Sequence, residues 1–338
     1  MSPLTIASVH VHPVKSCGGI AVDVAALTRD GLAWDRQWAV VRADTGRALT
    51  QRDTPVLALI SAALPAEALL GGAWGDEGGG APAAALTLTG PPGDGHPPLI
   101  IPLHRPAAPR TRTPVSVWEY AGDADDEGEE AAAWVSAVVG RAVRLVRYAP
   151  GGGRPRLVAP AWTPAGAPPG AEAAFKDGYP LLVTSAASAA DLAARLGRAG
   201  LDGRRFRANI VIAGAAPWEE DGWAELSIGG EGGGEGIRVG LAKPCDRCTI
   251  PAVNPETGVV DGKDITPALR AFRTGSALGW AGVQAPWRNA VFFGWNGAAI
   301  GCGGGGDGRA VVGLVRVGDP VAIVRRRAGP PAPAGAAA

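Results

Sequence analysis

The chain has 338 residues and a mass of 34.1 kDa, enough for two domains of ordinary size, each with its own core. Hydrophobic residues make up 46% and charged residues 19%, which is typical of a folded globular protein and excludes a disordered one. The formal net charge is zero, which argues against a dedicated nucleic-acid or membrane-surface binder. No apolar run reaches the roughly 18 residues of a spanning helix.

The amino terminus contains no basic region followed by an apolar stretch, so we expect no secretory signal. The four cysteines at positions 17, 245, 248 and 302 are too sparse for a disulfide framework of the secreted kind. We therefore expect a protein of a reducing compartment, the cytoplasm, although an organelle stays open.

The first half of the chain is rich in short strand patterns. Alternating or β-branched runs predict strands at 5–14, 38–43, 55–64, 98–103 and 142–149. Apolar residues spaced by three and four, with a glycine near the end, predict a helix over Glu129–Arg141. The Gly-rich stretch 71–84 is predicted to be a loop, because it has no means of burying a core.

The second half mixes strands with short helices. A strand, a Thr-Ser turn and a helix capped by Ser185 or Ser188 are predicted over 180–197. A helix is predicted over 264–273, with Thr266 as its cap and Pro267 as its first residue. The remaining strands are predicted at 204–214, which begins with arginines, at 227–230 and 237–245, separated by a Gly-rich hairpin insert, and as a pair within 310–327.

The order of these elements predicts the class of fold. Strands outnumber helices and do not alternate with them regularly, which favours a β-rich, barrel-like α+β architecture over a doubly wound parallel sheet. We expect a domain over residues 1–125, a second over 126–328 with a Pro/Gly-rich insertion at 150–173, and a disordered tail over 329–338.

Cys245 and Cys248 form a C-x-x-C pair with several possible uses. A structural zinc site needs four ligands, and the chain has neither a second pair nor suitably spaced histidines. A redox pair of the thioredoxin type lies at the start of a helix. Pro251 and Pro255 oppose a long helix after Cys248, which argues against this use. Two buried structural thiols remain a plain alternative. A fourth possibility is one thiolate acting as a soft ligand to a metal that a cofactor otherwise holds.

The last possibility predicts anion-binding residues elsewhere in the chain, because such a cofactor is negatively charged. Lys243 precedes the pair and Arg247 lies between the two cysteines, and both would help keep a thiol ionised. Lys15 and Ser16 lie in a Gly-rich turn after the first strand, where amides and an ammonium can grip a phosphate. Further candidates at the ends of predicted strands are Arg36, Thr184, Ser185, Arg207 and Asn209.

Six segments together resemble one known family. "VHPVKSCGGI", "GLAWDRQWAVV", "DGYPLLVTSAASAADL", "FRANIVI", "KPCDRCTIPAVNPETG" and "VRVGDPVAIV" occur in the order found in MOSC-domain proteins. The resemblance runs from about residue 5 to about residue 325, apart from Gly/Pro-rich insertions, and is greatest to the amidoxime-reducing component family. It implies an amino-terminal MOSC β-barrel module followed by a MOSC β-barrel domain with short helices.

The resemblance also implies a cofactor and roles for individual residues. It implies the molybdenum cofactor (molybdenum bound to molybdopterin), with Cys248 as the protein ligand to the metal. Cys245 matches a position that is not the ligand. Asn209 matches an active-site polar group. The positions implied to hold the cofactor are Lys15, Ser16, Arg36, Thr184, Ser185, Arg207, Asp246, Arg247 and Cys248.

The implied activity is reduction of N-hydroxylated compounds such as amidoximes and hydroxylamines, with nitrite reduction to nitric oxide as a further possibility. Because the chain has no C-x₄-C-x₂-C iron–sulfur run, we expect an external electron donor, either cytochrome b5 with its NADH-dependent reductase or a ferredoxin-like protein. We expect no nucleic-acid partner and no membrane span.

The alternative function is a non-catalytic carrier of the molybdenum cofactor or a sulfuration-type MOSC protein. The glycine run 301–308 does not indicate nucleotide binding, because no strand–helix unit follows it.

Overall fold

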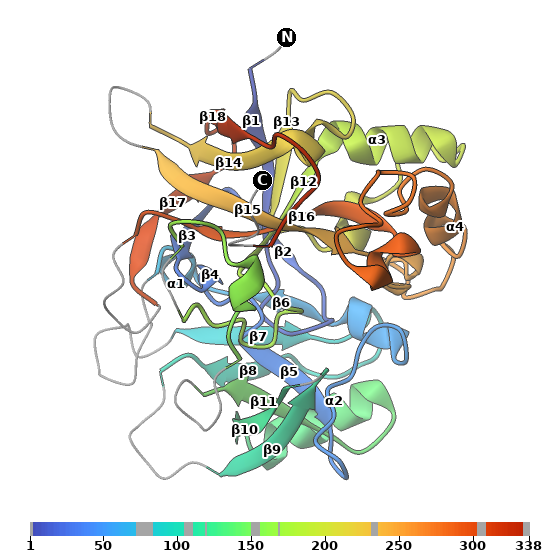
Figure 1. The fold of residues 1–338 in the computed structure, drawn as a ribbon. Helices are drawn as coiled ribbons and strands as arrows, with labels where there is room; N and C mark the ends of the chain where they lie inside the picture. Colours follow the sequence, from blue (N-terminus) through green and yellow to red (C-terminus); the bar gives the residue numbers. More distant parts are fainter. Residues whose placement is uncertain are drawn as a thin grey trace.

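The structure, a computed structural model, describes residues 3–71, 84–104, 111–118, 120–149, 156–167, 170–230, 236–302 and 309–333. Strands dominate these residues, and α-helices are few and short. Figure 1 shows an upper part, built from the start of the chain and from its last half, above a lower part built mostly from the segment between them. The β-rich α+β fold predicted from the sequence is confirmed.

The upper part is organised around one mixed sheet of eight strands. The strand order is β18-β14-β15-β16-β12-β13-β1-β2, and all neighbours pair antiparallel except β12 and β13. The two strands from the start of the chain therefore extend a sheet that otherwise belongs to its second half. The bounds are β1 Thr5–Val11, β2 Ile20–Val22, β12 Leu181–Ser185, β13 Ile210–Ala213, β14 Trp223–Ile228, β15 Ile237–Asp246, β16 Phe292–Ala299 and β18 Val321–Arg326.

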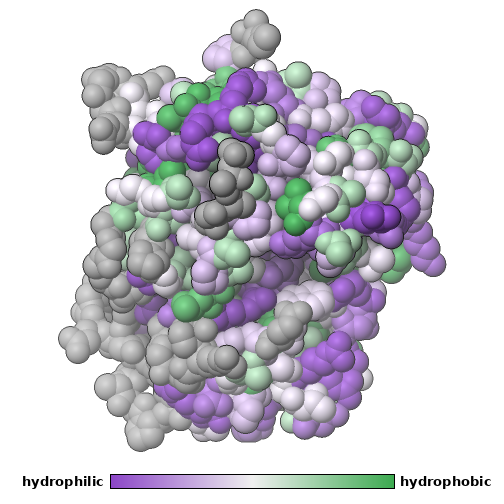
Figure 2. Space-filling view, in the orientation of Figure 1, coloured by the Kyte–Doolittle hydropathy of each residue, from purple (hydrophilic) through white to green (hydrophobic). Residues whose placement is uncertain are grey.

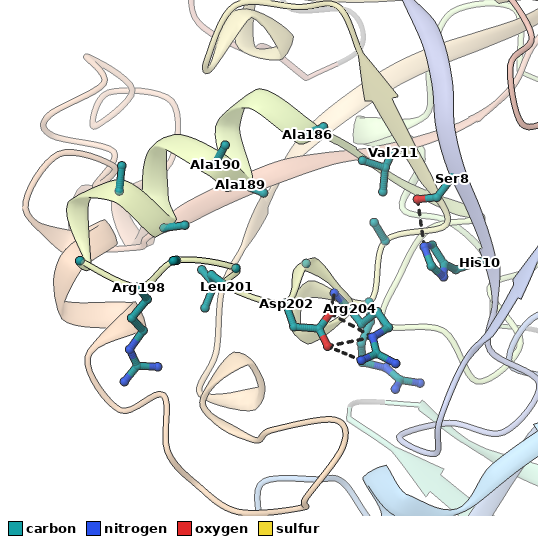
Figure 3. A pocket seen from close by; sticks show the side chains of 18 of the residues that line it. Ser8, His10, Ala186, Ala189, Ala190, Arg198, Leu201, Asp202, Arg204 and Val211 are labelled. Atoms are coloured by element: carbon teal, nitrogen blue, oxygen red, sulfur yellow. Dashed lines mark hydrogen bonds and ion pairs between the residues drawn. The ribbon is translucent and has the colours of Figure 1, made fainter.

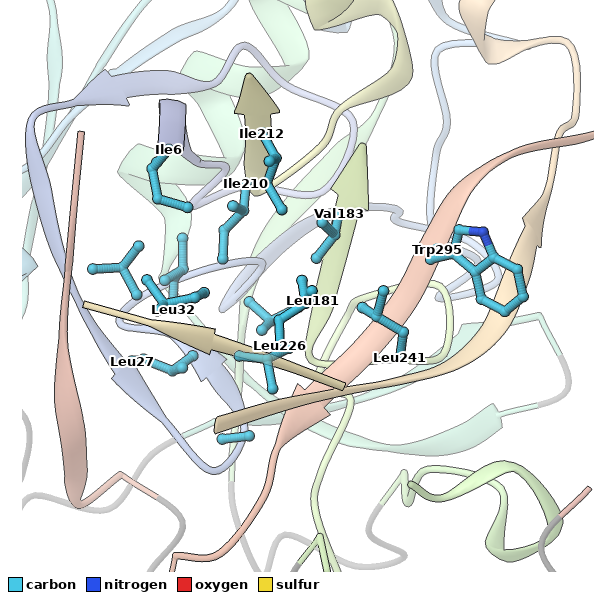
Figure 4. Packing of buried hydrophobic residues seen from close by; sticks show 14 of the residues in the cluster. Ile6, Leu27, Leu32, Leu181, Val183, Ile210, Ile212, Leu226, Leu241 and Trp295 are labelled. Atoms are coloured by element: carbon cyan, nitrogen blue, oxygen red, sulfur yellow. The ribbon is translucent and has the colours of Figure 1, made fainter. Parts of the chain in front are cut away.

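A small second sheet lies against this one and closes the upper core. It runs β17-β3-β4, with bounds Val311–Arg316, Val24–Thr28 and Gly31–Leu32. Figure 4 shows side chains from both sheets, among them Leu27, Ile210 and Leu226, packed into one apolar cluster. The alternation of a strand places Ala25 and Leu27 in this cluster and Ala26 in the core of the lower part. Strand β3 is thus shared by both cores.

The lower part contains two further antiparallel sheets and a helix. One sheet runs β5-β11-β10-β9 and the other β6-β7-β8. Helix α2 (Glu129–Val139) covers this part with Ala131, Trp134 and Val135, and it ends at Gly140, which adopts the left-handed conformation. The strand bounds are β5 Trp38–Arg42, β6 Ser61–Ala63, β7 Ala85–Thr89, β8 Leu99–Pro102, β9 Arg112–Val117, β10 Tyr120–Asp126 and β11 Val143–Tyr148.

The remaining helices are short. They are α1 Ala66–Leu69, α3 Ala186–Arg195, α4 Ile265–Arg270 and the 3₁₀ helices η1 Pro55–Leu59, η2 Pro160–Trp162, η3 Gly203–Phe206, η4 Glu219–Gly222, η6 Ile250–Ala252 and η7 Ala285–Arg288. No helix in the described ranges is long and apolar enough to cross a bilayer.

Three local expectations are wrong. The predicted strand 55–64 begins as η1, because Pro55 favours the first turn of a helix, and only Ser61–Ala63 is a strand. The arginines of 204–214 lie in η3 and its end, not in a strand. Thr266 and Pro267 lie inside α4, whose N-cap residue is Asp264.

Parts of the expected loops and of the tail lie outside the described residues, namely 72–83, 150–155, 168–169, 231–235, 303–308 and 334–338. Within the Pro/Gly-rich segment 150–173, Trp162 is buried and its ring lies 5.1 Å from the ring of Trp287. This part of the insertion therefore packs on the upper core and is not a free linker. The domain division at residue 126 stays a prediction.

Candidate functional site

One cavity of about 180 Å³ contains most of the residues singled out in the sequence. Its walls come from the first turn, the segment before β5, the β9–β10 turn, the approach to β12, the approach to β13 and the loop after β15. These segments are far apart in the sequence and meet where the upper and lower parts join. The lining residues used below are Lys15, Ser16, Arg36, Trp118, Lys176, Asp177, Tyr179, Arg207, Asn209, Lys243, Cys245, Asp246, Arg247 and Cys248.

Cys245 and Asp246 are the last two residues of β15, and Arg247 and Cys248 begin the loop that follows; these four residues are called the cysteine loop below. The backbone N–H of Arg247 donates to the carbonyl of Val291 (2.7 Å), which ties the loop to the start of β16. The Arg247 guanidinium donates to Cys245 Sγ (3.1 Å) and to the carbonyl of Phe206 (2.9 Å). Burial raises the pKa of the Cys245 thiol, and Arg247 opposes that rise. Cys248 is half-buried and makes no disulfide, so its sulfur is open to a ligand.

The turn after β1 presents Lys15 and Ser16 to the cavity. Its shape is fixed by Lys15 N–H donating to Trp38 O (2.7 Å) and by Ser16, which adopts a positive φ of 65°. The Lys15 ammonium is buried and donates to Phe175 O (3.0 Å) and to Asp177 Oδ1 (2.5 Å). Burial lowers the pKa of Lys15, and the Asp177 carboxylate counters that effect.

Arg36 and Arg207 bring two further positive charges to the cavity, beside that of Lys15. Both residues adopt positive φ angles, 52° and 56°. The Arg36 guanidinium contacts both oxygens of the buried Asp35 (2.7 and 2.5 Å) and donates to Arg207 O (2.9 Å). Arg207 donates through Nη1 to Cys17 O (2.6 Å). Burial, reinforced by the charge of Arg36, lowers the pKa of Arg207 to about 10. The two guanidiniums are therefore held close together against their mutual repulsion.

Three residues that line the cavity carry buried donor atoms without a hydrogen-bond partner among the described residues. They are Lys176 Nζ, Arg207 Nη2 and Arg247 Nε. Unsatisfied buried donors are costly, so their clustering needs an explanation. Six cations line the cavity against the two carboxylates Asp177 and Asp246. The cavity is therefore suited to an anionic group rich in acceptors.

The structure brings together eight of the ten residues named from the sequence. Lys15, Ser16, Arg36, Arg207, Asn209, Asp246, Arg247 and Cys248 line the cavity. Thr184 and Ser185 do not line it: both are buried at the end of β12. Ser185 is the N-cap residue of α3, but its hydroxyl makes no cap hydrogen bond and has no partner among the described residues.

Several lining residues were not predicted from the sequence, among them Trp118, Lys176, Asp177 and Tyr179. Trp118 lies in a hairpin turn of the lower part and donates through Nε1 to Asp177 Oδ1 (3.0 Å). Burial raises the pKa of Tyr179, and the Asp246 carboxylate adds to the rise. Trp118 and Lys176 lie outside the six segments quoted above, whereas Asp177 and Tyr179 lie in "DGYPLLVTSAASAADL", of which only Thr184 and Ser185 were named as candidates.

A larger cavity of about 640 Å³ lies beside α3, lined by alanines of that helix and by Ser8, His10, Asp202 and Arg204 (Figure 3). Asp202 and Arg204 are paired with each other there, and no cysteine lines this cavity. The smaller cavity therefore remains the better candidate for chemistry.

No group of three or more His, Cys, Asp or Glu side chains in the described ranges is placed to hold a metal ion. On the face shown in Figure 2, hydrophobic residues are scattered among polar ones.

Comparisons with known proteins agree with the fold and show the family. Residues 3–142 match the MOSC N-terminal beta barrel domain and residues 171–322 match the MOSC domain. The chain is 32% identical to mitochondrial amidoxime-reducing component 1 of Mus musculus, over 80% of this chain and 71% of that protein. It is 31% identical to component 1 and 30% identical to component 2 of Homo sapiens, in each case over 80% of this chain and 72% of the relative.

Proposed function

The chain belongs to the amidoxime-reducing component family of MOSC-domain proteins, and from that premise we propose that it is a molybdenum-cofactor-dependent reductase of N-hydroxylated compounds. The proposed overall reaction adds two electrons and two protons to an N–OH group, breaks the N–O bond, and releases the amine or amidine and one water. The observation that carries the proposal is the half-buried thiol of Cys248 in a cavity lined by unsatisfied cationic donors.

The residues present fit the cofactor. A pterin with a phosphate is anionic and rich in acceptors, which suits the buried donors of Lys176, Arg207 and Arg247. A soft thiolate is an appropriate ligand for its metal, and Cys248 is the free thiol that the loop after β15 leaves open. When bound, the cofactor supplies the two electrons that reduce the N–O bond.

The chain itself positions the reactants in this proposal. Lys15, Arg36 and Arg207 hold the anionic part of the cofactor in this proposal. Arg247 fixes the cysteine loop through Val291 and Phe206, so that the thiol of Cys248 keeps one orientation. Catalysis then depends on orientation in a small cavity.

Finer features of the activity belong to the same proposal. We expect electrons to come from an external donor, cytochrome b5 with its NADH-dependent reductase or a ferredoxin-like protein. Nitrite is a further candidate substrate, because a small anion suits a cation-lined cavity. A cytoplasmic location is proposed.

The first test compares two cysteines of the same loop. The measurements are molybdenum and pterin content of the purified chain and reduction of benzamidoxime by reduced viologen dye. We expect turnover in the wild type, none in Cys248→Ala, and most of the activity in Cys245→Ala, which loses the thiol contacts with Arg247 and with the carbonyl of Asp246. A Cys248→Ala protein that binds molybdenum and reduces benzamidoxime normally would refute the ligand assignment. A wild type that binds the cofactor but reduces no substrate would favour the carrier function.

A further inference from the structure

Trp118 occupies an unusual place for a large aromatic residue. Val117 of β9 pairs with Tyr120 of β10, so Trp118 lies in the two-residue connection of this hairpin. Its side chain is 47% exposed, and it belongs to none of the hydrophobic clusters of the described residues. It nevertheless lines the cavity that contains Cys248. An exposed aromatic side chain at the wall of a candidate active site is a possible substrate contact.

The backbone of Trp118 adds to this argument. Its φ of 56° is in the left-handed region, where a two-residue hairpin connection favours Asn, Asp or Gly. A bulky residue there is strained, and strain of this kind gathers at functional sites. The sequence thus has tryptophan where turn chemistry alone would select a small residue.

Trp218 provides an internal comparison, because its local arrangement is nearly the same. It also has a positive φ (65°), donates through Nε1 to a carboxylate, Asp191 (2.8 Å), and lies under a guanidinium at 4.5 Å, that of Arg273. Its ring, however, packs against Phe272 and Phe293, with centroids 5.2 and 5.7 Å away. Packing therefore explains Trp218, whereas the described residues give no such explanation for Trp118.

Two contacts hold the Trp118 ring in one orientation. Its Nε1 donates to Asp177 Oδ1 at 3.0 Å, and the Arg52 guanidinium lies 4.5 Å from the ring centroid. Asp177 also accepts a hydrogen bond from Lys15, so the Trp118 ring is linked through Asp177 to one of the cations that line the cavity. The Asp177 side chain is 66% exposed, which places a carboxylate beside the aromatic ring and open to solvent.

We propose that Trp118 is a specificity-determining residue, whose ring stacks on planar, delocalised N-hydroxylated substrates such as aromatic amidoximes. This inference rests on the proposed reductase function. The ring supplies an apolar face for an aromatic amidoxime, and a planar amidinium product gains from the same face and from the charge of Asp177. Small aliphatic substrates have less surface to stack and gain less from the ring.

The test uses Trp118→Asn, which suits the left-handed turn, and Trp118→Phe, which keeps an aromatic ring. Trp218→Phe is the control outside the cavity. The first readout is the ratio of kcat/KM for benzamidoxime to that for acetamidoxime. The second is the Kd for the product benzamidine by calorimetry, which needs no turnover. We expect Trp118→Asn to lower the ratio and raise the Kd by about three- to tenfold. For Trp118→Phe we expect a ratio and a Kd between those of Trp118→Asn and the wild type. For Trp218→Phe we expect both values to match the wild type.

A second measurement separates a binding role from a structural one. We expect Trp118→Asn to unfold at a Tm equal to or above that of the wild type, because Asn suits a positive φ. If Trp118→Asn binds benzamidine as tightly as the wild type, or if the wild type does not bind it, the inference is wrong. A wild type that binds benzamidine through Trp118 but reduces no N-hydroxylated compound with any donor would refute the proposed function and leave the aromatic contact standing.

Discussion

The side-chain amide of Asn209 bonds to the backbone on two sides. Its Oδ1 accepts from Leu182 N–H (3.1 Å) and its Nδ2 donates to His10 O (3.2 Å), so it joins β12 to β1 beneath the cavity. It is buried, with 2% of its surface exposed. Although the sequence indicates an active-site polar group, these contacts leave little of the amide for substrate.

Removing this amide is therefore expected to lower stability first. Asn209→Ala leaves two part-buried backbone groups, Leu182 N–H and His10 O, without this partner, which costs about 2 kcal/mol at about 1 kcal/mol each. Urea unfolding measures the loss of free energy. If Asn209→Ala has the same urea midpoint of unfolding as the wild type but a much lower kcat, Asn209 acts in catalysis and not in stability.

Glu220 is a second residue with a testable energetic role, away from the cavity. It is 1% exposed, and its Oε2 accepts from Ser188 Oγ at 2.8 Å while Oε1 has no partner among the described residues. Burial, with a smaller contribution from Asp221, raises its pKa from 4.5 to about 7 against the opposing effects of Ser188 and Arg273. The folded state thus holds a proton that the unfolded state releases at lower pH.

The sign of the pH dependence follows from this difference. Between pH 4.5 and about 7 the folded chain binds one more proton than the unfolded chain, so this contribution to stability falls as the pH rises. The total loss is about 3 kcal/mol at 1.36 kcal/mol per pKa unit. Glu220→Gln removes the penalty, so we expect it to exceed the wild type in unfolding free energy at pH 8 and to approach it near pH 4.5. Equal pH profiles for the two proteins would contradict this account.

The candidate site shows what one sequence reveals about single residues. Lys15, Arg36, Arg207 and the cysteine loop lie in segments with recognisable patterns, and the structure gathers them in one cavity. Trp118 was missed because its turn carries no local signal, and Asp177 was missed although it opens the quoted segment "DGYPLLVTSAASAADL". Their proximity arises only from the contact of the β9–β10 turn with the approach to β12.

At the scale of elements, the β3–β4 hairpin lies close against the segment before β12, and a single glycine, Gly31, allows this approach. Gly31 has a φ of 111°, and a Cβ there would lie 2.3 Å from Pro180 O and 3.2 Å from Lys176 Cε. Neither the backbone angle nor the space permits a side chain. The close approach is therefore a requirement of the fold and not a local preference.

Gly31→Ala is expected to lower the unfolding free energy by more than about 3 kcal/mol, because the strained angle and the clash with backbone add. Gly93→Ala is the matched control. Gly93 also has a positive φ (82°), but nothing lies within 4 Å of its Cβ position, so the cost should be about 1 kcal/mol. Thermal and urea unfolding of both variants measure the difference. Equal losses at the two positions would show that the clash is relieved by movement.

The elements themselves were predictable where local and tertiary signals agree. Helix α2 has an amphipathic pattern and a left-handed Gly140 at its end, and it lies where the sequence places it. The strand predicted at 55–64 failed because Pro55 and buried Leu57 suit a 3₁₀ turn as well as a strand. The cap predicted at Thr266 failed for a different reason. Burial of Ile265 and Leu269 sets where α4 begins, and this tertiary contact outweighs the cap preference.

At the scale of the whole molecule, the two halves of the sequence are interleaved. Strand β1 pairs with β13, and β3 pairs with β17, so the first 30 residues complete sheets of the second half. Strand β11 comes after the predicted boundary at residue 126, yet it pairs with β5 of the first half. Short-range patterns predict the strands but not these partners, because pairing across more than 200 residues is decided by the assembled core.

This interleaving predicts that neither half folds alone. A fragment of residues 126–338 would lack β1 and β3, whose Val9, Val11 and Leu27 bury the upper core with Ile210 and Leu226. A fragment of residues 1–125 would lack α2 and β11 and expose Val40 and Trp38. We expect each fragment to show no cooperative thermal transition, and their co-expression to restore one, because the missing strands then return to their sheets. A fragment of residues 126–338 that unfolds cooperatively at the Tm of the full chain would mean that β1 and β3 add to a core that is already complete.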